Sequence, residues 1–397
     1  MVSRRQALVG AMVIVVLTSL LNYTLVYAGH GLWARFRPPL PAALEHPAFR
    51  EFLSVLKHVE QNYVTPLDRG TLFTGATRGM LKSLDDPYSY YMDAREYQEL
   101  QIQTEGVFGG IGVTVEYLDN YVTVISVLEG TPAEQAGLQA GDRVSLVDGK
   151  DVTPLPYDQI LNMIRGKPGS TVTITVLRGT QKVDFSIVRA EIHVKSVSWK
   201  KLAGDLAYVR ISRFQSETGE QFLAALNQIK AAKLTGLVID LRNNGGGLLT
   251  QCVAITEALI PSGPVVLVED REGNRRSLGK GHAKDLPPLV ILVNEFTASA
   301  SEILAGAVKD TGTGTLVGVK TFGKGTVQSL LQLAEGAAVK LTTQRFLTPT
   351  GYSIHDNGGI QPDVVVGLTD ADRAQKLKFD DPRHPQLAKA IELLRGR

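Results

Sequence analysis

The chain has 397 residues, of which 44% are hydrophobic and 21% are charged, and its formal net charge is +2. This composition is typical of a globular protein, and the length accommodates two to three domains with cores of their own. The small net charge and the lack of a basic run argue against nucleic acid as a partner. A single cysteine, Cys252, excludes an intrachain disulfide, and its apolar neighbours predict a small buried side chain.

Residues 1–28 predict a targeting segment. Arg4 and Arg5 precede an apolar stretch that continues to about Ala28, close to the ~20 residues that span a bilayer. The basic pair would stay inside while the rest of the chain is exported, so an uncleaved single-pass anchor in the cell membrane is the favoured interpretation. The small residues at the end of the stretch also suit a cleavage site, which would make the protein periplasmic or secreted.

A helical region follows a proline-containing linker at residues 29–47. Residues 48–103 carry apolar side chains at helical spacing, such as Phe52 and Leu56. The run LDDPYS at residues 84–89 then ends this periodicity. The pattern predicts either a plain helical pair that packs on the next domain or a dedicated helical cap.

Residues 104–191 predict a compact β-rich unit, because short β-branched or alternating runs are separated by turn signals. Strands are expected at 121–128, 143–147, 171–177 and 183–188, and helices at 132–137 and 157–164. Before them lies a glycine-rich loop whose backbone N–H groups can converge on an anion, beside a strand edge that can pair with an extended peptide. Together with the later run AGLQAGD, this loop resembles that of a PDZ domain. The resemblance implies that the carboxylate of a peptide is bound by Gly110, Ile111, Gly112 and Val113.

Strands and helices alternate over residues 192–369, which predicts an α/β sheet with the functional groups at the strand ends. Leu206–Ile211 and Gly236–Leu241 are expected to be strands of this sheet. The second of them runs into RNNGGG at residues 242–247, directly before another predicted helix.

A further strand-to-helix corner carries three hydroxyl side chains, those of Thr297, Ser299 and Ser301. The run LVILV at 289–293 predicts a buried strand, and helical spacing begins near Glu302. Such a corner exposes side chains at the sheet edge and presents unpaired backbone N–H groups. Thr297 and Ser301 suit structural roles, with Ser301 as the N-cap of the helix.

A serine nucleophile at this corner would need a base. None of the seven histidines stands in a recognisable serine-protease pattern, and no Gly-x-Ser-x-Gly elbow is present. A lysine kept neutral by burial is the other route, since desolvation lowers the pKa of the ammonium. Lys324, between two glycines, is such a lysine. The same run is one residue short of a P-loop, with Gly325 where a magnesium-binding Ser or Thr should stand, so nucleotide binding is not favoured.

The runs TASASE at 297–302 and FGKGTVQ at 322–328 resemble the signature of the C-terminal processing peptidases, also called tail-specific proteases. The resemblance covers most of the chain. It implies that Ser299 is the nucleophile, that Lys324 is the general base, and that Gln328 orients the lysine. The spacing between Ser299 and Lys324 agrees with that family.

Further roles follow from the same resemblance. Gly245 and Ala300 would supply the two N–H groups of an oxyanion hole, while Gly246 and Gly247 also admit the interpretation of a flexible turn. Arg165 resembles an arginine that links the PDZ domain to the protease core and gates the site. A solvated arginine in a turn is the alternative for Arg165.

We therefore expect a mixed α/β multidomain protein, with a membrane segment, a helical cap at 48–103, an inserted PDZ-like domain at 104–191 and a peptidase core at 192–369. The expected function is a Ser-Lys endopeptidase that cleaves near the C-termini of extracytoplasmic proteins, with no metal or cofactor. A catalytically silent PDZ scaffold that binds protein C-termini is the second hypothesis, and a different amide or ester hydrolase the third. The tail at 370–397 either packs against the body or mediates self-association as a homo-oligomer.

Overall fold

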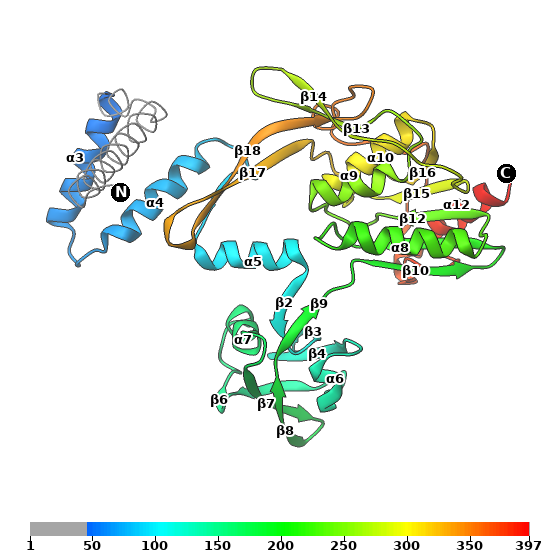
Figure 1. The fold of residues 1–397 in the computed structure, drawn as a ribbon. Coiled ribbons are helices and arrows are strands. Elements are labelled where there is room, and N and C mark those ends of the chain that lie inside the picture. The colour runs from blue at the N-terminus through cyan, green and yellow to red at the C-terminus, as the bar shows by residue number, and fades with distance from the viewer. Residues whose placement is uncertain (1–45, 397) are drawn as a thin grey trace, which may run out of the picture. The chain divides into compact units, whose positions relative to one another are not determined.

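The structure of the chain is a computed structural model that describes residues 46–396 (Figure 1). The predicted targeting segment at residues 1–28 lies outside the described residues, as does nearly all of the predicted linker. Between residues 46 and 396, no helix combines the length and the hydropathy that a bilayer crossing needs. The chain forms two compact units, which divide between Gly79 and Met80 and are described separately.

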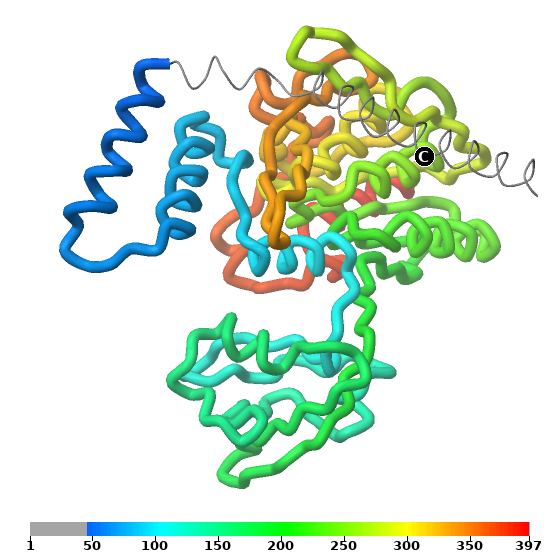
Figure 2. Tube along the Cα trace, turned by 60° about the vertical axis from the view of Figure 1, so that its left-hand side comes forward, coloured from blue at the N-terminus to red at the C-terminus, as the bar shows by residue number. Residues whose placement is uncertain are grey.

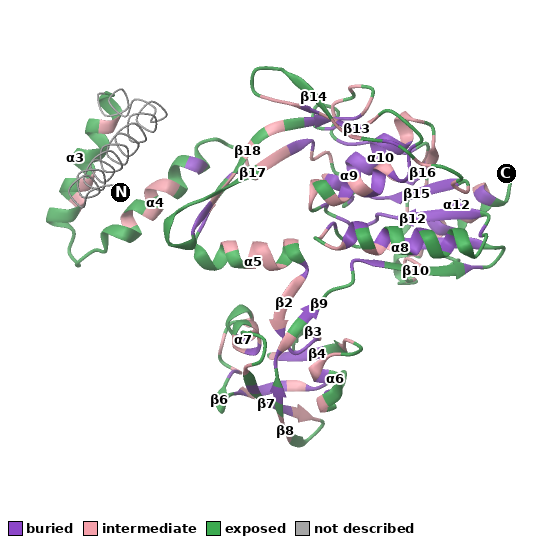
Figure 3. Cartoon of the chain, in the orientation of Figure 1, coloured by how far each residue is buried: buried purple, intermediate pink, exposed green. Residues whose placement is uncertain are grey.

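Two helices form most of the described part of the first unit, residues 46–79. α3 runs from Pro47 to Asn62 and α4 from Arg69 to Lys82, so the last residues of α4 belong to the second unit. Proline suits the first position of α3 because no intrahelical acceptor exists for an N–H there. No residue of α3 is buried (Figure 3). The spacing of its apolar residues places them on one face of the helix. These helices confirm the predicted helical N-terminal region.

The second unit contains a β-rich domain with the predicted strands and helices. β2 (Val107–Gly110) pairs with β9 (Ala190–His193), and the strands between them form an antiparallel sheet. The bounds in this domain are β3 Val113–Leu118, β4 Tyr121–Val127, α6 Pro132–Ala136, β5 Arg143–Val147, β6 Lys150–Asp151, α7 Tyr157–Ile164, β7 Thr171–Arg178 and β8 Gln181–Val188. Branched side chains such as Val144 and Ile174 form its core with Ile160 of α7.

An α/β domain is built on a second six-stranded sheet, in the order β10-β11-β12-β15-β16-β19. The bounds are β10 Val197–Leu202, β11 Leu206–Ile211, β12 Gly236–Asp240, β15 Leu289–Val293, β16 Gly314–Gly318 and β19 Val364–Val365. All neighbours from β11 to β19 run parallel, and only β10 is antiparallel to its neighbour. Every residue of β12 and β15 is buried (Figure 3), as expected for parallel strands covered on both faces.

Helices cover both faces of this sheet. The bounds are α8 Thr218–Ala231, α9 Leu249–Glu257, α10 Ala300–Asp310 and α12 Pro385–Arg395. α8, α9 and α10 share one apolar core with the sheet, and α12 packs in the other. Along β12, Leu237 and Ile239 belong to the first core and Val238 to the second, because successive strand side chains alternate between faces. The predicted α/β domain with buried parallel strands is thus confirmed.

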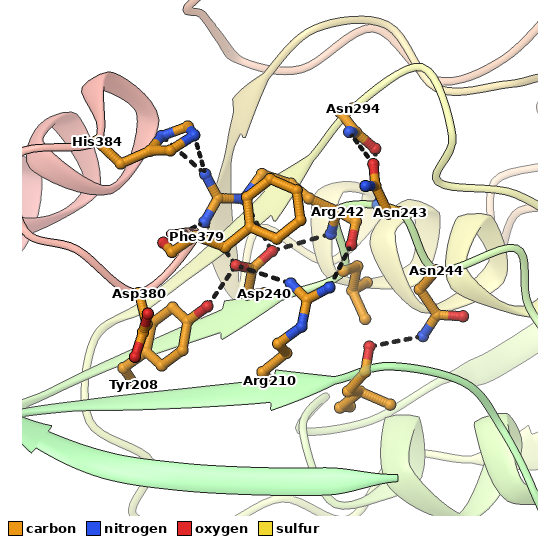
Figure 4. Close-up of polar contacts among 12 residues, drawn as sticks. Tyr208, Arg210, Asp240, Arg242, Asn243, Asn244, Asn294, Phe379, Asp380 and His384 are labelled. Atoms are coloured by element: carbon orange, nitrogen blue, oxygen red, sulfur yellow. Dashed lines mark hydrogen bonds and ion pairs between the residues drawn. The ribbon is translucent and has the colours of Figure 1, made fainter. Parts of the chain in front are cut away.

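The C-terminal tail packs against the α/β domain. This confirms the first of the two predictions for residues 370–397, packing against the body. Leu387 and Leu394 of α12 are buried on the sheet. The fully buried Arg242, which follows β12, donates to His384 Nδ1 at 3.0 Å and to the Phe379 carbonyl oxygen at 2.7 Å (Figure 4). Because arginine can only donate, the His384 ring must accept, and burial together with the Arg242 charge lowers its pKa.

A further, five-stranded sheet, which the sequence patterns did not predict, has the order β1-β18-β13-β14, and β17 also pairs with β18. The bounds of the remaining elements are β1 Tyr90–Met92, α5 Ala94–Glu105, β13 Pro264–Glu269, β14 Arg275–Lys280, β17 Thr326–Gln332, η1 Ala334–Gly336, β18 Ala338–Leu347 and α11 Asp370–Ala374. β17 and β18 form a long hairpin, orange in Figure 2. The loop that carries Lys324 leads directly into β17.

Candidate active site

Ser299 lies where β15 ends and α10 begins, as the sequence predicted. It is the N-cap residue of α10, with φ 57° and ψ −119°. A positive φ is uncommon for a residue with a Cβ and marks local strain. Its neighbours hold the corner, since Thr297 Oγ1 donates to the Leu241 carbonyl oxygen at 2.9 Å and accepts the N–H of Asn294 at 2.9 Å.

Ser301 is not the helix N-cap, because Ser299 occupies that position, so this prediction was wrong. The Ser301 side chain is fully buried, and its Oγ donates to the Asn244 carbonyl oxygen at 3.0 Å. The bond ties the start of α10 to the turn after β12. Ser301 therefore serves the packing of the corner.

Asparagines join the two strand-end corners (Figure 4). The Asn243 N–H donates to Asn294 Oδ1 at 2.9 Å, and Asn294 Nδ2 donates to Asn243 Oδ1 at 2.6 Å. The Asn244 carbonyl oxygen accepts the N–H of Ala298 at 3.0 Å, and its Nδ2 donates to the Ile211 carbonyl oxygen at 2.9 Å. The turn after β12 and the turn after β15 are thus held together as one structure.

Gly246 lies directly against the nucleophile corner. Its φ is 96°, and a Cβ here would lie 2.8 Å from Ser299 Cβ and 2.9 Å from the backbone nitrogen of Ala300. A Cβ at Gly247, whose φ is 144°, would lie 2.0 Å from the Phe214 carbonyl oxygen. The interpretation of these glycines as a flexible turn was therefore wrong, since close backbone approach requires both.

Two backbone N–H groups at this corner are free. Within the described residues, neither Gly245 nor Ala300 donates its N–H to another backbone or side-chain group. The N–H of Ala300 opens α10 and has no intrahelical acceptor. The Gly246 N–H, in contrast, donates to Asn244 Oδ1 at 2.9 Å. Gly245 and Ala300 can accommodate an oxyanion, and their assignment as its donors stays a prediction.

We expect Gly246→Ala to reduce peptide cleavage by about 100-fold, because its methyl group would displace Ser299 or Ala300 and a 1 Å displacement can cost about that much. Gly245→Ala is the matched control. A Cβ there meets no atom within 4 Å and the N–H is kept, so the loss should be far smaller. Initial rates on one internally quenched peptide compare the variants, and thermal unfolding checks their folds. Equal rates would contradict the close packing at Gly246.

Lys324 is half-buried in the loop between β16 and β17. Desolvation, followed by the positive charge of Lys340, lowers the pKa of its ammonium to about 8, while the charges of Asp86 and Glu302 act in the opposite direction. A lysine with this pKa can act as a base near neutral pH. In residues 46–396, no hydrogen bond joins Ser299 Oγ to Lys324 Nζ, which instead lies over the ring of Tyr88.

Tyr88 belongs to the LDDPYS run, for which the sequence indicated only the end of a helix. Its ring centroid lies 4.2 Å from Lys324 Nζ, a cation–π distance. The Asp86 carboxylate accepts the N–H of Tyr88 at 2.9 Å, and Ser89 Oγ accepts the N–H of Thr342 in β18 at 2.9 Å. This turn therefore supplies one wall of the lysine site, a role that sequence reasoning missed.

Gln328 lies on β17, shortly after Lys324. Its Nε2 donates to Thr326 Oγ1 at 2.9 Å and to Thr342 Oγ1 at 3.2 Å. These bonds fix the amide nitrogen and leave Oε1 as the atom that can accept from a lysine. The role of Gln328 in orienting Lys324 stays a prediction.

The glycine-rich loop of the β-rich domain borders an apolar groove. Its lining includes Phe108, Ile111, Val113, Tyr157, Ile164 and Arg165. A Cβ at Gly112, whose φ is 88°, would lie 2.3 Å from Thr131 Cβ, so only glycine fits there. In the described part of the chain, the N–H groups of Ile111 and Gly112 donate no hydrogen bond, which leaves them for an anion. The Arg165 guanidinium lies 5.2 Å over the Phe108 ring, and its gating role stays a prediction.

A serine at a strand-to-helix corner, a half-buried lysine and a groove for peptide ends define a serine peptidase with a peptide-binding module. The comparison with family models agrees. Peptidase family S41 matches residues 205–366, the PDZ domain matches residues 109–188, and the activating protease CtpB N-terminal domain matches residues 44–96.

Similar proteins extend this result. A carboxy-terminal-processing protease of Bartonella bacilliformis is 39% identical over 324 residues, which cover 79% of this chain and 74% of that protein. A "Probable CtpA-like serine protease" of Staphylococcus haemolyticus is 37% identical over 315 residues, 78% of this chain and 63% of that protein. This chain thus spans less than two thirds of the staphylococcal protein.

The chain belongs to peptidase family S41 and is a serine peptidase of the carboxy-terminal-processing type. An S41 protease structure from Bacteroides fragilis, 17% identical, shares the fold with a TM-score of 0.52, over 84% of this chain and 93% of that one.

Proposed function

We propose that this chain is an endopeptidase in which Ser299 is the nucleophile and Lys324 the general base, and that it cuts proteins near C-termini held by its PDZ domain. One observation carries the assignment of this pair. The backbone N–H groups of Ser299 and Lys324 donate to the same oxygen, Glu302 Oε2, at 2.8 and 2.9 Å. The two residues are therefore adjacent, although they come from different loops.

In this mechanism the flexible Lys324 side chain turns from Tyr88 toward Ser299 and, in its neutral form, takes the hydroxyl proton as Oγ attacks the scissile carbonyl. The oxyanion binds the N–H groups of Gly245 and Ala300, each worth roughly 3 kcal/mol by comparison with subtilisin. The lysine ammonium then protonates the leaving amine. Water, activated by the lysine, hydrolyses the acyl-enzyme.

If the PDZ domain binds C-terminal carboxylates, a bound peptide tail should stimulate cleavage. A peptide with a free C-terminal carboxylate, added in trans, should raise the cleavage rate of a second, internally quenched peptide that lacks a favourable tail. The amidated form should bind at least about tenfold more weakly, since hydrogen bonds to a charged group contribute about 1.5–3 kcal/mol. Initial rates against the concentration of each added peptide give the comparison. Equal stimulation by acid and amide would contradict carboxylate recognition.

Two variants separate the binding of a peptide tail from the stimulation of cleavage. Gly112→Ala should abolish binding of the free-acid peptide, because its Cβ would overlap Thr131. Arg165 stacks on Phe108 beside the groove. We propose that it couples the binding of a peptide in the groove to the activity of the protease core. A ligand can shift such an equilibrium only by its differential affinity for the two states. Arg165→Ala should therefore keep binding and lose stimulation, whereas retained stimulation would refute gating.

The proposed location is the cell membrane, with an extracytoplasmic catalytic domain held by residues 1–28 as a single-pass anchor. The apolar length of that segment and its arginine pair support the proposal. An anchored protein should resist extraction by high salt and alkali and retain its N-terminus in the measured mass. A soluble form that starts near Gly29 would show a cleaved signal peptide instead.

A further inference from the structure

One buried carboxylate connects the nucleophile corner to the lysine loop. Glu302 is the third residue of α10 and is fully buried. Its Oε2 accepts the N–H of Ser299 at 2.8 Å and that of Lys324 at 2.9 Å. Its Oε1 accepts the N–H of Gly323 at 2.8 Å and the hydroxyl of Thr321 at 2.5 Å. These four donors fill the four lone-pair positions of the carboxylate.

Helix capping explains only one of the four bonds. A glutamate three residues after the N-cap ordinarily accepts the N-cap N–H alone. Here the other three donors come from residues 321–324, which the start of a helix does not require. The capping bond itself is donated by the N–H of Ser299. It stabilises the backbone of Ser299, whose positive φ is otherwise unfavourable. The four bonds therefore fix two loops that are separate in the sequence.

Several charged or aromatic groups face the Lys324 ammonium. Asp86 and Glu302 supply negative charge, Lys340 supplies positive charge, and the Tyr88 ring lies against Nζ. Within residues 46–396, Glu302 forms no ion pair, so its buried charge is compensated by hydrogen-bond donors. Removal of the Glu302 charge would disfavour the ammonium form of Lys324, because Asp86 alone would then oppose Lys340 and desolvation.

We propose that Glu302 is the positioning residue that sets the nucleophile and the base relative to each other. The proposal rests on the roles proposed for Ser299 and Lys324. Glu302 acts through their backbones and does not reach the substrate, since all four of its bonds are internal. Its loss should therefore lower kcat and leave KM nearly unchanged.

Glu302→Gln in the full chain tests this. One side-chain oxygen remains, but the amide nitrogen donates and cannot accept, so two of the four bonds are lost. We expect kcat to fall about 100-fold with KM within about twofold, and the acid limb of the kcat profile to move to lower pH. A purely structural role would reduce the folded fraction without moving that limb. A wild-type kcat and an unmoved limb would overturn the proposal.

Glu257→Gln is the matched control. Glu257 ends α9 and accepts the N–H of Lys280 in β14 at 2.8 Å with one oxygen, so the same substitution removes a helix-end carboxylate charge elsewhere while the amide oxygen can keep the bond. Its kcat and pH profile should equal those of the wild type. A wild-type chain that cleaves no peptide would refute the proposed function. If the wild type is active, Ser299→Ala is inactive and Glu302→Gln equals the wild type, only the role of Glu302 is refuted.

If Glu302→Gln does not fold, variants of Thr321 test the positioning role of Glu302. Thr321→Val removes, at nearly constant volume, one donor to the carboxylate and the acceptor of the Ile360 N–H, and it should lower kcat about tenfold, the effect of roughly 1.4 kcal/mol. Thr321→Ser keeps the hydroxyl and should restore the rate. An unchanged kcat in Thr321→Val would overturn the proposal.

Discussion

Ser299→Ala is expected to abolish peptide cleavage, with a loss of about 10⁶-fold in kcat by comparison with the nucleophile of subtilisin. Ser301→Ala, only two residues away, should keep most of the activity. The Ser301 hydroxyl is buried and donates to the Asn244 carbonyl oxygen, which also accepts the N–H of Ala298. Loss of one of two donors leaves that oxygen satisfied, so the cost should be about 1 kcal/mol of folding stability.

The comparison uses initial rates on one internally quenched peptide, with the free energy of unfolding of both variants measured in denaturant. A Ser301→Ala protein that folds but loses as much activity as Ser299→Ala would contradict the division of roles. Substantial cleavage by Ser299→Ala would refute the nucleophile.

Lys324→Arg should be as damaging as Lys324→Ala, because a guanidinium stays protonated in proteins and cannot accept the serine proton. The wild-type rate should rise with pH and level off above about 8, since the neutral amine increases as pH passes the pKa of Lys324. The unfolded chain holds this proton up to about 10.5, so stability should also rise between about 8 and 10.5. A pH–rate profile and denaturant unfolding at several pH values test both statements.

Lys340 provides the control for this assignment. Its positive charge helps to lower the pKa of Lys324, so Lys340→Gln should raise that pKa and move the rate profile to higher pH without removing activity. A fully active Lys324→Arg would refute the base. A profile that stays in place in Lys340→Gln would assign the observed ionisation to another group.

Local patterns predicted the strands and the two strand-end corners well. β12 and β15 are short apolar runs that end in polar or glycine-rich turns, and parallel strands place such ends at one edge of the sheet. The corner residues Gly245 and Ser299 could therefore be placed together from the sequence. The PDZ-like elements were equally accessible, because short strands and glycine turns alternate there.

Contacts between distant segments could not be predicted in this way. Tyr90 of β1 pairs with Lys340 of β18, and this sheet brings Tyr88 over Lys324. Arg242 reaches His384, which lies 142 residues later. No local periodicity encodes such pairs, because each segment finds its partner only through tertiary packing.

Close packing explains the two sequence interpretations that were wrong. Glycines such as Gly246 and Gly247 are typical of flexible turns. In the folded chain, however, backbone atoms of other segments occupy the space that a side chain would need at both positions. Ser301 suited an N-cap, but the helix starts two residues earlier because Ser299 adopts a positive φ. Only the folded backbone reveals such constraints.

Covalent labelling of the full chain with a serine-directed peptidyl phosphonate, followed by mass spectrometry of its proteolytic fragments, tests the Ser-Lys assignment most directly. The proposed mechanism predicts one adduct, on Ser299, with a rate that rises through pH 8 and with no adduct in Lys324→Arg. An adduct on another residue, or labelling of Ser299 that persists at the wild-type rate in Lys324→Arg, would contradict it.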